Sequence, residues 1–156
     1  MSKFYQGFYK ILNKEKYRGD SNNCIYRSAF EKRFMMWLDK SPNVLHWSSE
    51  EIIINYKNKL DNKSHRYFVD FYVEFLNNSK FIIELKYSKY TKPPKKTSKY
   101  YISESYEFIK NTSKWSYAKE YADKNNMKFI ILTEKEIGKE FSDRKIMENL
   151  QNLKIL

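Results

Sequence analysis

Two runs of alternating side chains, residues 66–76 and 81–87, constrain the fold of this chain more than any other feature. Successive side chains of a β-strand point to opposite faces, and in both runs one face is entirely apolar or aromatic. The intervening Asn77-Asn78-Ser79 favours a hairpin turn. The sequence therefore predicts an antiparallel strand pair that buries one face in a hydrophobic core. On the first strand we expect this face to hold Tyr67, Val69, Phe71, Val73 and Phe75.

The opposite face of the predicted hairpin carries charge: Asp70 on the first strand, Glu84 and Lys86 on the second. Opposed residues of an antiparallel pair share a face. Two registers make the apolar faces coincide, one pairing Asp70 with Lys86 and the other pairing Asp70 with Glu84. A two-residue turn would need a bulge. Either register gathers the two carboxylates and the amine on one patch, with opposed Cβ atoms roughly 5 Å apart.

Two carboxylates held this close repel each other unless a cation lies between them. Hard oxygen ligands with few other donors suit Mg²⁺, which also binds phosphate. Such a metal polarises a phosphodiester and acidifies a bound water, while Lys86 positions that nucleophile, stabilises negative charge or acts as a base. Alternatively, Asp70 and Glu84 are solvated residues on an open sheet face, with Lys86 as their ion-pair partner. The low preference for Asp inside strands slightly favours the functional interpretation.

The composition favours a polyanionic partner and excludes several site types. The chain has 156 residues, enough for one ordinary domain, and 30 Lys and Arg against 19 Asp and Glu give a net charge of +11. An AT-rich genome also raises the lysine count. The single cysteine, Cys24, excludes an internal disulfide and a cysteine zinc cluster. No apolar run approaches the ~18 residues of a membrane span, and no signal peptide is evident, so we expect a reducing, cytoplasmic location.

The remaining sequence predicts an α/β domain whose mixed central sheet is flanked by helices. Residues 1–22 form a basic, irregular arm that wraps the domain or reaches toward a partner, and residues 23–156 form the single domain. The core order is one helix, three strands, helices and a strand. The expected helices are 26–39, 98–110 and 112–124, and the expected further strands are 44–47, a buried 51–56, and 127–132. The residues after this last strand look helical and weakly packed.

In this order the motifs resemble the PD-(D/E)xK nuclease superfamily. The resemblance is carried by Ser28-Ala29-Phe30-Glu31 on the first helix, His65-Arg66-Tyr67-Phe68-Val69-Asp70-Phe71 and Ile83-Glu84-Leu85-Lys86. The combination is similar to the head-completion nucleases of T-even-type phages and to the endonuclease subunit of certain cut-and-paste transposases. It spans roughly residues 17–137, most of the chain.

The resemblance implies a restriction-endonuclease-like fold, DNA cleavage and dependence on Mg²⁺, for which Mn²⁺ substitutes. It implies that Asp70 and Glu84 bind the metal, that Lys86 is the catalytic lysine, and that Glu31 completes the site. Val69 stands where proline often precedes the aspartate; this position shapes the strand and supplies no ligand. Phage head or portal proteins are expected partners besides DNA, and the host cytoplasm or the virion is the expected location.

A basic loop, residues 88–97, follows Lys86 directly. Its lysines would neutralise substrate phosphates beside the metal; alternatively, it is a solvated, flexible loop. The predicted DNA-binding residues are Lys89, Lys92, Lys95, Lys96, His65, Arg66 and Lys114. Two other functions stay open: a non-catalytic neck protein that binds DNA ends, and a transposase-type endonuclease subunit. No sequence-reading helix motif is present, so a weakly specific or structure-selective cutter is expected.

Overall fold

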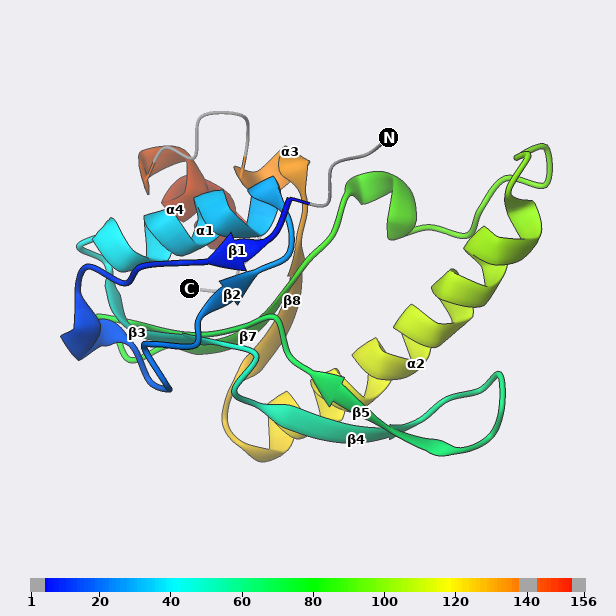
Figure 1. Ribbon diagram of the computed structural model, residues 1–156, viewed down its shortest axis with the longest axis horizontal. Helices are drawn as coiled ribbons and strands as arrows, with labels where there is room; N and C mark the ends of the chain where they lie inside the picture. Colours follow the sequence, from blue (N-terminus) through cyan, green and yellow to red (C-terminus); the bar gives the residue numbers. More distant parts are fainter. Residues whose placement is uncertain (1–4, 138–142, 153–156) are drawn as a thin grey trace.

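A four-stranded mixed sheet forms the centre of the computed structural model, which describes residues 5–137 and 143–152 (Figure 1). Its strands lie in the order β3 (Val44–Ser49), β6 (Phe71–Phe75), β7 (Lys80–Leu85) and β8 (Lys128–Leu132). The first three are antiparallel neighbours, and β8 runs parallel to β7. Helix α1 (Ala29–Lys40) covers one face and α2 (Tyr101–Lys124) the other. This confirms the predicted mixed sheet between helices.

Helix α1 begins three residues later than expected because Ser28 caps it. The Ser28 hydroxyl accepts a hydrogen bond from the Glu31 amide at 3.1 Å, the usual way to satisfy a free amide in the first turn. Phe30, Phe34 and Leu38 then recur every four residues and are buried against the sheet.

The β6–β7 hairpin takes the second of the two registers open to the sequence. Phe71 pairs with Ile83, and the Phe75 amide bonds to the Ser79 carbonyl at 3.0 Å. The loop is therefore 76–78, with Asn78 in the left-handed region at φ 66°, as three-residue hairpin loops commonly require. This register directs Asp70 toward Glu84. The register that opposed Asp70 to Lys86, and the two-residue turn, are wrong.

A corner interrupts the first strand of the predicted hairpin, so the continuous strand 66–76 is wrong. Its first part, β5 (Ser64–Phe68), leaves the central sheet and pairs with β4 (Ile53–Lys57) in a separate two-stranded sheet. Between the pairs Ser49–Phe71 and Ile53–Phe68, the segment that joins β3 to β4 has three residues, 50–52, and the segment that joins β5 to β6 has only two, 69–70. This extra residue is a β-bulge, which bends both strands together.

The corner also redirects the side chains before it. Tyr67 and Val69 do not share a core with the rest of the apolar row but join Ile82 beneath α2, which corrects the predicted common face. Phe71, Val73 and Phe75 pack on the α1 side, as expected. In β4 burial alternates, and Ile53 is 47% exposed, so residues 51–56 are not the buried strand predicted.

Helix α2 is one uninterrupted helix where the sequence predicted two. The expected break falls at Asn111, which is followed by Thr112 and Ser113, and residues of these types often compete with the helical backbone. Here both hydroxyls turn back onto the Ile109 carbonyl, at 3.0 Å from Thr112 and 2.8 Å from Ser113. The polar side chains are satisfied inside the helix, and it continues to Lys124.

The two ends of the described chain pack on the α1 side of the sheet. In the N-terminal segment, β1 (Gly7–Phe8) pairs with β2 (Ile25–Tyr26), a 3₁₀ turn η1 covers Lys14–Lys16, and Tyr9, Ile11 and Tyr17 are buried. This segment therefore wraps the domain. After β8 come α3 (Glu134–Ile137) and α4 (Asp143–Asn152), whose Ile137 and Ile146 are buried. The prediction of weak packing is therefore wrong for α3 and α4. Residues 138–142 and 153–156 lie outside the described part of the chain. No described helix combines the length and apolarity that crossing a membrane requires.

Candidate active site

Asp70 lies at the corner, just before β6, and points toward the middle of β7. Its Oδ2 accepts a hydrogen bond from the Leu85 amide at 3.0 Å, so the side chain is tied to the neighbouring strand. The pKa of Asp70 is raised well above its usual value, first because the group is withdrawn from water and then by the negative charge of Glu84. Glu31 adds to this, and Lys86 opposes it. The surroundings of Asp70 therefore favour its neutral, protonated form.

Glu84 is only 5% exposed, on the face of β7 that α2 covers. One of its oxygens, Oε2, accepts a hydrogen bond from the Tyr67 hydroxyl, and the other lies 3.8 Å from the Lys86 amine. A buried carboxylate needs such donors because leaving it unpaired is costly. The predicted cluster of Asp70, Glu84 and Lys86 is therefore assembled in the structure.

Lys114 brings a second amine to the same place from α2. It precedes Ala118 and Ala122 at four-residue spacing, so it continues the stripe that faces the sheet. Its amine lies 5.4 Å from the ring centre of Tyr67, in a cation–π contact. Withdrawal from water and the charge of Lys110 lower the pKa of Lys114, while the nearby Glu84 and Asp70 oppose this shift.

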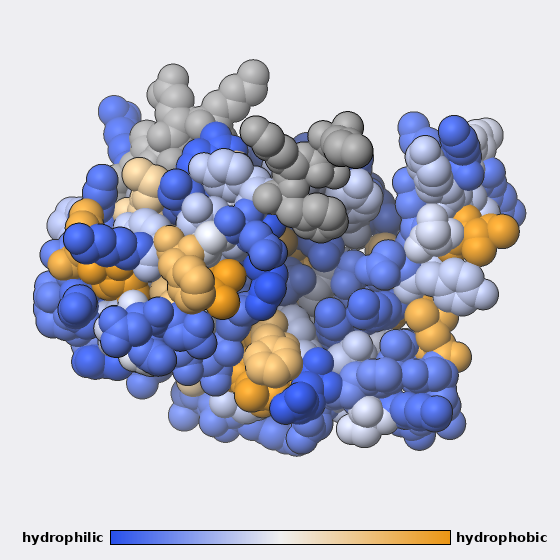
Figure 2. All heavy atoms as spheres, viewed as in Figure 1, coloured by the Kyte–Doolittle hydropathy of each residue, from blue (hydrophilic) through white to orange (hydrophobic). Residues whose placement is uncertain are grey.

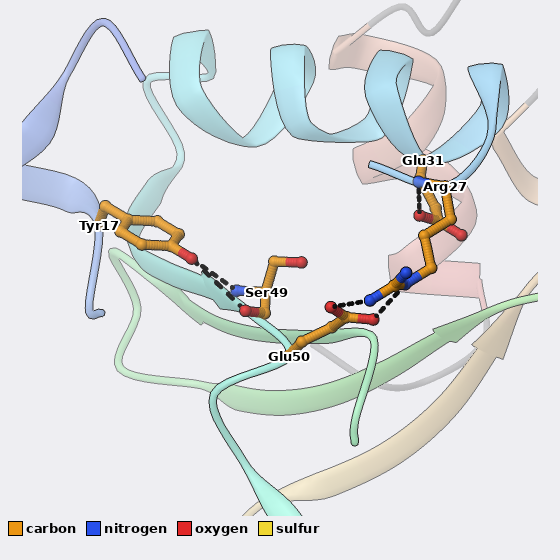
Figure 3. Close-up of polar contacts among 5 residues, drawn as sticks. All are labelled: Tyr17, Arg27, Glu31, Ser49 and Glu50. Atoms are coloured by element: carbon orange, nitrogen blue, oxygen red, sulfur yellow. Dashed lines mark hydrogen bonds and ion pairs between the residues drawn. The ribbon is translucent and has the colours of Figure 1, made fainter. Parts of the chain in front are cut away.

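Glu31, the fourth predicted site residue, lies in the first turn of α1 beside Arg27 (Figure 3), and its charge acts on Asp70. Its Oε2 accepts a hydrogen bond from the Arg27 amide at 2.7 Å. Burial raises the pKa of Glu31, and the charges of Glu50 and Glu84 raise it further. The negative charge of Glu84 therefore raises the pKa of Glu31 as well as that of Asp70.

Glu50 links this part of the site to the corner. The Arg27 guanidinium forms a two-pronged ion pair with its carboxylate, at 2.9 and 3.1 Å (Figure 3). Its amide bonds to the Val69 and Asp70 carbonyls at 3.1 and 3.3 Å. Its φ of 56° is the left-handed conformation that side chains rarely adopt. Strain of this kind persists where the surroundings hold it, often near a functional site.

Sequence reasoning assigns no site role to Tyr67 and Arg27, and it favours a structural or supporting role for Glu50. Unbroken alternation along the strand predicts that Tyr67 lies on the core face. Only the bulge at residues 50–52 turns its hydroxyl toward Glu84, and nothing in the alternating pattern of the first strand signals that bulge. The pair of Arg27 and Glu50 joins residues far apart in sequence, which spacing alone does not reveal.

The chemistry of these donors fits a divalent cation. Asp70 and Glu84 are hard oxygen ligands, close enough for the charge of one to raise the pKa of the other. Within residues 5–137 and 143–152, however, no three His, Cys, Asp or Glu side chains are gathered closely enough to hold a metal ion. The geometry therefore offers a two-carboxylate site, and the role of Glu31 as a further ligand stays a prediction.

The predicted DNA-binding residues fall into separate regions. Lys89, Lys92 and Lys95 line a pocket that begins at Lys86, and Lys96 is exposed on the same loop. His65 and Arg66 lie instead on the β4–β5 hairpin. There the His65 ring nitrogen is 2.6 Å from a carboxylate oxygen of Asp61, and the Arg66 guanidinium lies 5.5 Å from the ring centre of Phe68.

Comparison with known proteins assigns the chain to a nuclease family. The family model described as TnsA-like endonuclease N terminal matches residues 41–134, a span that includes Asp70, Glu84, Lys86 and Lys114. The head completion nuclease of Enterobacteria phage T4 is 39% identical over 137 residues, which make up 83% of this chain and 91% of that protein. Among solved structures, none matches the chain. Both matches confirm the resemblance expected from the sequence motifs, and the chain belongs to the family of TnsA-like endonuclease N-terminal domains.

Proposed function

We propose that this chain is a divalent-metal-dependent endodeoxyribonuclease that acts in phage head completion. The observation that carries the proposal is the pairing of Asp70 with Glu84 at the corner, inside the family's endonuclease domain and beside the amine of Lys86. A protein that only bound DNA would gain nothing from two carboxylates on its binding surface, because they repel phosphates.

Asp70 and Glu84 would hold the metal, with Glu31 as a further ligand or a ligand to its water. Oxygen donors of this kind favour Mg²⁺, and Mn²⁺ shares the preference for them. Once bound, the ion would polarise the phosphodiester and acidify a water molecule. The Tyr67 hydroxyl holds one oxygen of Glu84, so it fixes how the ligand is turned.

The two lysines supply positive charge where the reaction develops negative charge. Lys86 lies 3.8 Å from Glu84, at the edge where a phosphate would reach the carboxylates. It would orient the attacking water or stabilise the charge on the phosphate oxygens. Lys114, over the Tyr67 ring, faces the same carboxylates from the other side and would contact a neighbouring phosphate.

DNA as the substrate and the phage head as the setting rest on other observations. The net charge of +11 favours a polyanion, and the similar T4 protein carries the name head completion nuclease. We infer that head or portal proteins are its partners, in the host cytoplasm or in the virion.

A cleavage assay on supercoiled plasmid tests the proposal. We expect wild-type protein to nick the plasmid with Mg²⁺ or Mn²⁺, and EDTA to stop it. Asp70→Ala and Lys86→Ala should abolish cleavage, whereas Lys119→Ala, which removes an exposed lysine of α2, should not. An RNA of similar length, incubated under the same conditions, tests the specificity for DNA and should stay uncut.

The main competing function is a structural head protein that binds DNA ends. It predicts metal-independent binding without cutting, and equal binding by the wild type and Asp70→Ala. This result with pure, folded protein would overturn the nuclease proposal.

A further inference from the structure

A pocket of about 660 Å³ opens beside Lys86, between the loop after β7 and the first half of α2. In Figure 1 the loop, which includes the 3₁₀ turn η2 (Ser88–Tyr90), arches away from the sheet before it reaches α2. Figure 2 shows the start of α2 and the adjoining end of this loop standing out from the rest of the molecule, with a notch between this protruding part and the body. The volume lies within the range of roughly 300–1,000 Å³ that is usual for small-ligand sites.

The walls and the rim of this pocket differ in chemistry. The rings of Tyr90 and Phe108 and the side chains of Pro93 and Pro94 give it apolar surfaces. The charged residues that line it are four lysines, Lys86, Lys89, Lys92 and Lys95, against two glutamates, Glu104 and Glu107.

The two glutamates sit on the α2 wall only. Glu107 is 3.9 Å from Lys110, which offsets part of its charge. The lysines come from the other wall, formed by Lys86, which directly follows β7, and by the loop after it. An anionic backbone would therefore follow the loop side, with its uncharged part turned toward the aromatic rings.

We propose that this pocket binds one unpaired nucleotide of the DNA substrate, next to the phosphate that is cut. The inference rests on the proposed nuclease function and adds the substrate class: DNA with a single-stranded segment, such as a flap, fork or gap. A nucleobase has a flat face that stacks on aromatic side chains whatever its sequence. The phosphates beside it match the lysine rim, whereas a double helix is too wide to enter.

Lys86 joins the pocket to the candidate active site, because it lines the one and lies 3.8 Å from Glu84 in the other. A strand that places a base between Tyr90 and Phe108 therefore has its adjacent phosphate near Lys86. Taking a base out of a duplex costs stacking and pairing, and this cost is smallest where the base is already unpaired. The pocket thus selects unpaired DNA without reading its sequence.

Binding without cleavage tests this inference. Full-length Asp70→Ala protein in EDTA is titrated with a fluorescent oligothymidylate and with a blunt duplex hairpin, and anisotropy gives both affinities. We expect tighter binding of the single strand. Phe108→Ala and Tyr90→Ala in the same background should weaken it roughly tenfold each, as loss of a stacking partner does. The affinity for the blunt duplex should stay the same.

Tyr106→Ala is the matched control, since Tyr106 is on the same helix, 57% exposed and outside the pocket lining. If removing Phe108 unfolds the protein, Ser103→Trp fills the pocket from an exposed position instead, with the same expected loss. Equal affinity for both DNAs, or losses that Tyr106→Ala reproduces, overturns the inference. The proposed function fails separately, if wild-type protein with Mg²⁺ cuts neither plasmid nor flap DNA.

Discussion

Two aspartates, Asp70 and Asp39, should respond in opposite ways to replacement by asparagine. Asp39 is fully buried, and its carboxylate accepts hydrogen bonds from the Tyr9 hydroxyl at 2.9 Å and from the Leu12 and Asn13 amides at 2.8 and 3.0 Å. Asp70 accepts one, from the Leu85 amide, and otherwise faces carboxylates. The first is a structural acid whose hydrogen bonds are satisfied, and the second is the proposed metal ligand.

Asp70→Asn should therefore raise the stability of the metal-free protein. An asparagine oxygen can keep the bond to the Leu85 amide, while the repulsion from Glu84 disappears. Relief of one strained functional group typically gains about 1–2 kcal/mol, or about 2–8 °C in Tm for a chain of this length. Asp39→Asn should lower the free energy of unfolding by about 1–3 kcal/mol. Both carboxylate oxygens of Asp39 accept hydrogen bonds, and the amide nitrogen that replaces one of them cannot accept.

The pH dependence follows from the sign of the shift. The folded-state pKa of Asp70 lies above the ordinary value of 3.8, so the folded state binds this proton more tightly than the unfolded state does. The contribution of Asp70 to the stability of the metal-free wild type should therefore be fully present below 3.8 and be lost as the pH rises through the folded pKa. The difference between wild type and Asp70→Asn should be full above the folded-state pKa of Asp70 and vanish in acid.

Thermal unfolding in EDTA, repeated across pH and then with Mn²⁺, measures all of this. Metal at a hundred times its Kd should stabilise the wild type by about 2.7 kcal/mol, and Asp70→Asn by much less. The reasoning is refuted if Asp70→Asn loses as much stability as Asp39→Asn in EDTA. Asp70 would then be a structural acid like Asp39.

Three further outcomes test other parts of the structure. Tyr67→Phe removes the donor to Glu84 but keeps the ring, so calorimetry should show Mn²⁺ binding about 10–100-fold more weakly, whereas Tyr56→Phe in the same core cluster should leave it unchanged. Asn78→Gly should preserve or raise Tm and Asn78→Val should lower it, because only the valine is strained at φ 66°; equal effects would contradict the three-residue loop. Salt titration of oligothymidylate binding should give a shallower slope of log Kd against log salt, by about 0.7 per lost phosphate contact, when glutamine replaces Lys89, Lys92, Lys95 and Lys96.

Local patterns predicted much of the fold and the centre of the site. Alternation located β6 and β7, and the polar turn limited the register to a few choices, one of which is observed. Because paired residues share a face, this was enough to bring Asp70 and Glu84 together. The helical stripe of α1 and the apolar strand β8 were also evident.

The errors arose where a residue's direction depends on distant parts of the chain. The bulge at residues 50–52 is defined only by how two strands pair, so the sequence of either strand alone gives unbroken alternation and misplaces Tyr67. The break predicted at Asn111 is absent from α2, where the hydroxyls of the next two residues, Thr112 and Ser113, bond within the helix. The pocket beside Lys86 forms only where the loop after β7 lies next to α2, and the sequence composition does not predict that these two segments are neighbours.

Because α2 is one unbroken helix, it fixes the distance between the residues in its two halves. Glu104 on the pocket wall and Lys114 beside the carboxylates are ten residues apart on the same helix, or about 15 Å along its axis. A helix resists stretching, so the proposed base pocket and the proposed cleavage site keep a constant spacing. Incisions should accordingly fall at a set number of nucleotides from the point where the two strands part.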